Sequence, residues 1–101
     1  MLENKFDAVT VKKYKEDLND LFFMINDFLY GIDMQRMDKS DLEVLISSFA
    51  KVIRLTGMYN DIIEQVIVDK EIVTADPQKY ISLNLNSAII LVEGIYSKYK
   101  V

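Results

Sequence analysis

Apolar residues recur along the chain in alternating steps of three and four, which is the spacing of one face of an α-helix. The first such segment covers about residues 10–30, with Thr10 as a candidate N-cap and Gly31 as a candidate left-handed terminator. Its apolar face comprises Val11, Tyr14, Leu18, Leu21, Ile25 and Phe28, widened by Phe22 and Leu29. The pattern therefore predicts a first amphipathic helix.

A second segment of the same kind covers about residues 41–66. Ser40 and Glu43 have the spacing of a capping box, which marks a helix start. Gly57 lies inside the segment, where glycine costs up to about 1 kcal/mol relative to alanine, and a close helix–helix approach would explain it. The predicted face comprises Leu42, Leu45, Phe49, Val52, Thr56, Tyr59, Ile63 and Val66, with Ile46, Ile53 and Ile67 beside it.

The segment that follows, residues 66–74, has a different pattern. Two clusters of β-branched residues flank the polar run 69–71. This arrangement suits a short extended connection or a small hairpin, and equally the end of a helix followed by a loop. Both interpretations stay open at the level of sequence.

A third helix is predicted over residues 77–99, because Asp76 and Pro77 have the N-cap and first-position chemistry of a helix start. Its main apolar face comprises Ile81, Leu85, Ala88, Val92, Ile95 and Tyr99. A second apolar strip contains Leu83, Ile90 and Leu91. Since a helix in a small domain needs to bury one face, two strips indicate either a central helix or an intermolecular contact.

Together these segments predict an all-α chain with three main helices in a single domain over residues 1–101. The second and third helices, within about residues 41–99, form an antiparallel hairpin joined by a short extended connection, and the first helix packs against it. No run of about 18 apolar residues exists and the N-terminus has no apolar signal region. We therefore expect no membrane partner and a cytoplasmic location.

The amino-acid composition excludes several classes of catalytic and metal site. The chain of 101 residues has no cysteine and no histidine, which removes thiolate sites and the usual general base. Two carboxylate pairs, Asp38 with Asp41 and Asp61 with Glu64, have a spacing that could hold a divalent metal. Helix capping and a solvated helix face account for them more simply. We expect no enzymatic activity, no metal and no cofactor, and keep a carboxylate-metal enzyme as a minor alternative.

Net charge is −4, which disfavours nucleic-acid binding by a single protomer. The densest basic cluster is Lys12, Lys13 and Lys15 in the first helix. These lysines are candidates for contacts with DNA phosphates, or they belong to a solvated helix face that continues into acidic residues at 16, 17 and 20.

From Asp38 onward, the order of features resembles the small terminase subunits of tailed bacteriophages over about two-thirds of the chain. The matching features are a helix start with spaced apolar residues, the end of a long helix at 62–68, an Asp-Pro start at 76–77, and an apolar continuation at 88–92. The first of these consists of Asp38, Leu42, Leu45, Ser48 and Phe49.

This resemblance implies a DNA-packaging component that forms a homo-oligomeric ring, binds double-stranded viral DNA, and recruits and regulates the large terminase subunit. A ring multiplies weak contacts through effective concentration. We expect Lys12, Lys13 and Lys15 to face DNA, and the oligomer contacts to include Leu83, Ile90, Leu91 and Tyr96. The alternative is a small acidic helical adaptor or inhibitor that binds a single protein partner.

Overall fold

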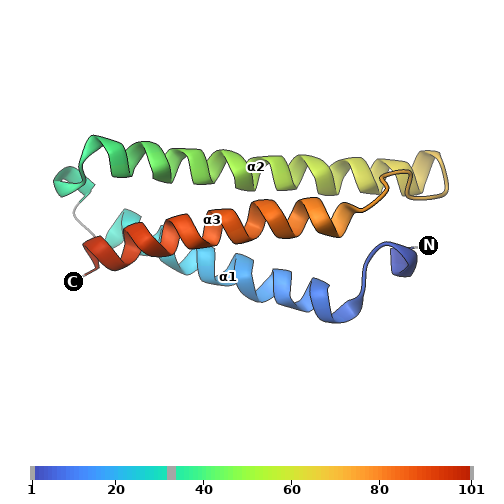
Figure 1. Cartoon of the computed structure of the whole chain (residues 1–101), viewed down its shortest axis with the longest axis horizontal. Coiled ribbons are helices and arrows are strands. Elements are labelled where there is room, and N and C mark those ends of the chain that lie inside the picture. The colour runs from blue at the N-terminus through green and yellow to red at the C-terminus, as the bar shows by residue number, and fades with distance from the viewer. Residues whose placement is uncertain (1, 32–33, 101) are drawn as a thin grey trace.

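Three long helices make up most of the computed structural model, which describes residues 2–31 and 34–100 (Figure 1). Consecutive helices run in opposite directions, and no strand occurs within the described ranges. The predicted all-α class and the hairpin of the second and third helices are confirmed. The elements are the 3-10 turn η1 (Leu2–Asn4), α1 (Ala8–Tyr30), the 3-10 turn η2 (Met34–Arg36), α2 (Lys39–Val68) and α3 (Pro77–Tyr99).

Aspartate side chains cap the start of all three helices. Asp7 accepts the backbone N–H of Thr10 at 2.8 Å, and Asp38 accepts that of Asp41 at 2.9 Å. The predicted caps at Thr10 and Ser40 are therefore wrong, because an aspartate a few residues earlier offers a charged acceptor to the free N–H groups. The predicted start of α3 is confirmed, since Asp76 accepts the N–H at position 79 and Pro77 is the first helical residue.

The end of α1 differs from expectation, whereas the segment after α2 follows one of its two sequence interpretations. Gly31 has φ −118°, so it continues the right-handed turn and is not a left-handed terminator. After α2, the connection forms a loop and not a small β-hairpin. In this loop, Gln65 Oε1 accepts the N–H groups of Val73 and Thr74 at 2.9 and 3.1 Å. These bonds satisfy backbone groups that a hairpin would have paired with each other.

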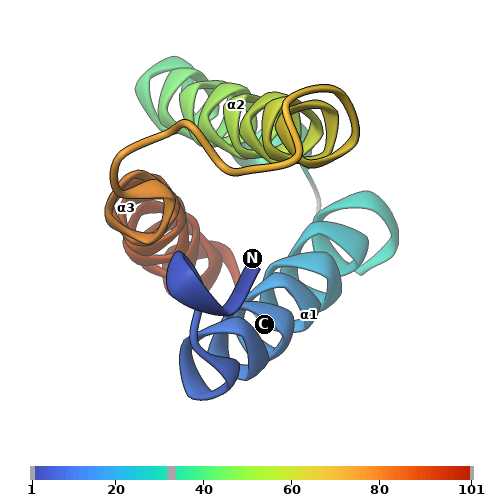
Figure 2. The same cartoon turned by 90° about the vertical axis from the view of Figure 1, so that its right-hand side faces the viewer.

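The core follows α3, which packs against both α1 and α2. Seen along the bundle, the three helices occupy the corners of a triangle (Figure 2). Along α3, Ile81, Leu85 and Ala88 are completely buried. On α2, the buried side contains Leu45 and Leu55. The central position of α3 therefore explains why its main apolar strip is buried.

The protomer is elongated and exposes more surface than its mass predicts. Its extents are 49 × 23 × 19 Å and its radius of gyration is 15.8 Å, against about 13 Å for a typical domain of this length. The accessible surface is 7030 Å², whereas a folded monomer of 11.7 kDa is expected to expose about 5,900 Å². Many of the exposed side chains are large and apolar.

Candidate protein–protein interface

A strip of apolar side chains runs along α2 beside its core-facing side, and one member, Phe49, also packs against the core. We call it the α2 stripe, and its members are Leu42, Ile46, Phe49, Ile53, Ile63 and Ile67, with Thr56 and Asn60 completing the spacing. All are exposed except Phe49, which is half-buried, and Ile53 is 70% exposed. Large contiguous apolar surfaces of this kind mark interaction sites, whereas single exposed apolar residues do not.

A second apolar strip borders the same region from α1. We call it the α1 strip; it contains Val11, Leu18, Phe22, Ile25 and Leu29, of which Leu18 and Ile25 are half-buried and the others are exposed. An open apolar depression of about 290 Å³ joins the two helices, because Val11 and Ile63 both line it. A second depression places Val11 and Leu18 opposite Tyr59. An apolar groove therefore lies between the first half of α1 and the last third of α2.

The interface residues predicted from sequence lie on α3 and have different surroundings. Leu83 and Ile90 are 61% and 68% exposed, while Leu91 is half-buried. Tyr96 packs edge-to-face on Phe28, with ring centroids 5.9 Å apart, and its hydroxyl donates to Asp27. That hydrogen bond raises the pKa of the Tyr96 phenol. Tyr96 thus contributes to the contact of α1 with α3 inside the protomer.

The sequence pattern does not predict an interface on the α2 stripe, because it places Leu42 and Ile63 on the buried face and Ile46, Ile53 and Ile67 only beside it. The stripe alternates steps of four and three residues, but so does the predicted buried face, so spacing alone does not separate the two.

The three lysines of the basic cluster are all exposed on α1. Helix geometry turns the chain by about 100° per residue, so Lys12 and Lys13 point to different sides, while Lys12 and Lys15 lie one turn apart. Lys13 Nζ forms an ion pair with Asp17 at 3.0 Å. The cluster therefore presents Lys12 and Lys15 together, and its contact with DNA stays a prediction.

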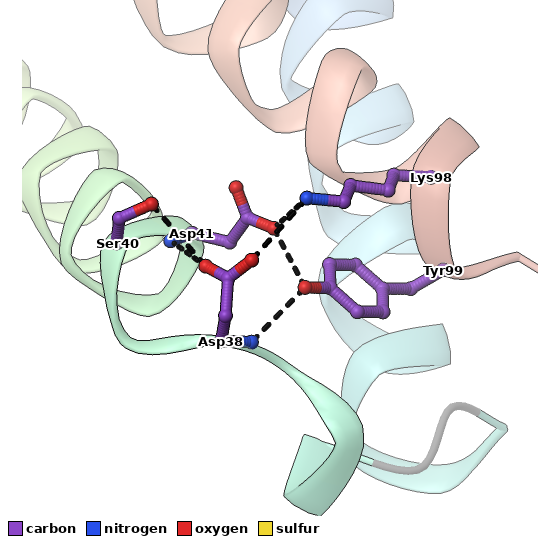
Figure 3. Close-up of polar contacts among 5 residues, drawn as sticks. All are labelled: Asp38, Ser40, Asp41, Lys98 and Tyr99. Atoms are coloured by element: carbon purple, nitrogen blue, oxygen red, sulfur yellow. Dashed lines mark hydrogen bonds and ion pairs between the residues drawn. The ribbon is translucent and has the colours of Figure 1, made fainter.

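At the far end of the hairpin, a polar cluster fastens α3 to the start of α2 (Figure 3). The hydroxyl of Tyr99 donates to Asp41 Oδ2 at 2.6 Å and accepts the N–H of Asp38 at 3.0 Å. Lys98 Nζ lies 2.7 Å from Asp41 Oδ2 and 3.3 Å from Asp38 Oδ2. The hydrogen bond to Asp41 raises the pKa of Tyr99. These carboxylates are engaged in holding the hairpin closed.

The cap at Asp38 makes the stability of the hairpin sensitive to acid. Its pKa lies below the usual 3.8, mainly because the carboxylate accepts the N–H of Asp41, with a further contribution from Lys98. A carboxyl with a lowered folded-state pKa stabilises the fold above its unfolded pKa, and this stabilisation disappears as pH falls through the folded pKa.

We therefore expect Asp38→Asn to be less stable than the native chain at pH 7, and the difference to shrink as pH falls below the ordinary aspartate pKa of 3.8. Urea denaturation at a series of pH values measures the difference in stability at pH 7 and its change with pH. Asp61→Asn, which changes an exposed carboxylate in the middle of α2, is the control. Identical pH dependence of the native chain and Asp38→Asn would contradict the assigned role.

Within residues 2–31 and 34–100, no group of three or more acidic side chains is arranged to hold a metal ion. No helix in this part of the chain is long and apolar enough to cross a membrane. In comparisons with known proteins, the chain matches no protein-family model, no curated protein and no solved structure.

Proposed function

We propose that this protein is a non-enzymatic assembly component that joins copies of itself through its exposed apolar surface. The observation that carries the proposal is the exposed α2 stripe together with the α1 strip, which meet at an apolar groove lined by Val11 and Ile63. The surface of the protomer exceeds that of a typical folded monomer by about 1,100 Å². A standard protein–protein interface covers about 800 Å² on each partner, so the excess suffices for one such contact.

The biological role that we propose is that of a small terminase subunit in phage DNA packaging. It rests on the order of sequence features from Asp38 onward, and it includes a ring of copies that recruits and regulates the large terminase subunit. Because each protomer carries a net charge of −4, DNA binding would depend on Lys12 and Lys15 being repeated in every copy. The assembly would act in the host cytoplasm.

A DNA-binding measurement tests this role. We expect the triple variant Lys12→Glu, Lys13→Glu and Lys15→Glu to bind double-stranded DNA at least about tenfold more weakly, with the slope of log K against log salt concentration reduced by about 2 for each protomer that contacts DNA. Gel shifts at several salt concentrations give both quantities, and solution mass shows whether assembly is preserved.

The matched control reverses three exposed lysines on other elements, Lys39, Lys70 and Lys79. If both triple variants bind DNA equally, the assigned contact is wrong. If the native chain gives no shift even at low salt, the packaging role itself is wrong.

The second candidate is an acidic adaptor or inhibitor that binds one protein partner. It is favoured by the same groove together with the net charge of −4, since an acidic helical surface suits a basic partner. A monomer in solution, with its groove covered only when a partner is added, would support this candidate over the first.

A further inference from the structure

The spacing of the α2 stripe is that of the a and d positions of a coiled coil. Ile46, Ile53, Asn60 and Ile67 follow one another at intervals of seven and take the a positions. Leu42, Phe49, Thr56 and Ile63 take the d positions. The pattern therefore continues through most of the length of α2, on a side that the protomer leaves exposed.

The identity of the a residues is informative. In parallel coiled coils, β-branched residues at a together with leucine at d favour two strands, and one asparagine at an a position fixes the register and the number of strands. Of the four d positions of the α2 stripe, Leu42 alone is leucine, so the proposal rests on the a positions. In α2, isoleucine occupies the a positions at 46, 53 and 67, and Asn60 occupies the other. Within the protomer these isoleucines gain little, because Ile46 and Ile67 are 58% and 62% exposed.

From this pattern we propose that two copies of the chain pair through their α2 stripes as a parallel coiled coil, with Asn60 facing Asn60 of the partner subunit. The inference rests on the proposed self-association and names its surface. A second copy is the occupant because a heptad seam of this kind is complementary to itself.

Residues beside the seam fit the parallel arrangement. In parallel pairs the g position of one helix lies against the e position five residues further along the other. This places Val52, which is half-buried in the protomer, beside Gly57 of the partner subunit. The glycine leaves room for the larger valine. In the protomer alone, a Cβ added at Gly57 would meet nothing within 4 Å, so no close approach inside the protomer explains this glycine.

An antiparallel pair in which a faces d would fit less well. It would set Phe49 against Asn60 of the partner subunit and bring Glu43 close to Glu64 of the partner subunit. Burying a polar side chain against an aromatic ring and opposing like charges both cost free energy. The parallel alignment instead sets Asn60 against Asn60 of the partner subunit, and this pairing favours it. Charge does not separate the two alignments, because the parallel pair brings Asp38 close to Glu43 of the partner subunit.

The second copy would also cover the α1 strip. Ile63 of the α2 stripe shares an apolar depression with Val11, so the two strips line one groove. A helix seated against α2 there lies within reach of α1 and occupies the place of a fourth helix in a bundle. One contact thus covers both apolar strips.

Disulfide cross-linking tests the alignment cleanly, because the chain has no native cysteine. In a parallel pair in register, residue 46 faces itself and so does residue 67. We expect Ile46→Cys and Ile67→Cys each to form covalent dimers under mild oxidation, at a rate at least about tenfold above Ile90→Cys. The last variant is the matched control, since Ile90 is an equally exposed isoleucine on α3.

Two cross-linking results would overturn the inference. One is a dimer with Ile90→Cys alone. The other is a dimer that forms only when Ile46→Cys is mixed with Ile63→Cys, which would indicate an antiparallel pair.

Solution mass separates failure of the seam from failure of self-association. Ile53→Glu should weaken the dimer at least about a hundredfold while helical content stays unchanged, because the altered side chain is exposed in the protomer. Ile90→Glu should leave the dimer intact. An assembled native chain that Ile53→Glu does not disturb overturns the seam but leaves the proposed self-association standing, whereas a monomeric native chain overturns both.

Discussion

Leu85→Ala is expected to lower the free energy of unfolding by about 2–5 kcal/mol. Leu85 is completely buried on α3, the helix that packs against both neighbours, so the truncated side chain leaves a cavity that three helices border. A loss of this size is a large fraction of the stability of a small domain. Urea denaturation followed by circular dichroism measures it.

Leu83→Ala provides the matched control, because it makes the same change two residues away on the same helix. Leu83 is 61% exposed, and its truncation should change the free energy of unfolding by no more than about 0.5 kcal/mol. Both variants are compared at one protein concentration, since association makes apparent stability depend on concentration. Equal losses in the two variants would mean that α3 is not oriented as described.

Ala88→Leu has the second largest expected effect. Ala88 is completely buried on the core face of α3, so a larger side chain must displace its neighbours, at a cost of about 1–3 kcal/mol or more. Gly94→Ala, on the same helix, is the control with the opposite sign. A Cβ at position 94 meets nothing within 4 Å, so alanine should stabilise the helix by about 0.5–1 kcal/mol. If Ala88→Leu were neutral, the close packing at this position would be disproved.

The three helices were predictable from sequence because each carries a long and regular apolar face. Their first residues were harder to place, since Thr10 and Ser40 are good caps by residue type. Asp7 and Asp38 take that role instead, and each also makes contacts with α3 that no local pattern reveals. Asp7 exchanges hydrogen bonds with Gln78, and Asp38 binds Lys98 and Tyr99.

Which apolar face each helix buries could not be predicted in the same way. α2 carries one strip through Leu45 and Leu55 and another through Ile46 and Ile53, and both have helical spacing. Only the position of α3 decides that the first strip is buried and the second exposed. Periodicity identifies a helix, whereas packing selects its inner face.

The candidate site residues could be predicted only in part, because the sequence does not show which side chains share a surface. Lys12 and Lys13 are neighbours in sequence, but a helix turns them to different sides. Tyr96, expected at an oligomer contact, packs on Phe28 within the protomer. By contrast, Leu83 and Ile90 are exposed, and their predicted role in assembly stays a prediction.

Light scattering on the purified native chain, over a range of concentrations, tests the central claim most directly. That claim is that the apolar groove between α1 and α2 is covered by another copy of the same chain. The expected mass is about twice 11.7 kDa or a higher multiple, falling towards one protomer on dilution. A mass of a single protomer at concentrations of about 100 μM would contradict the claim.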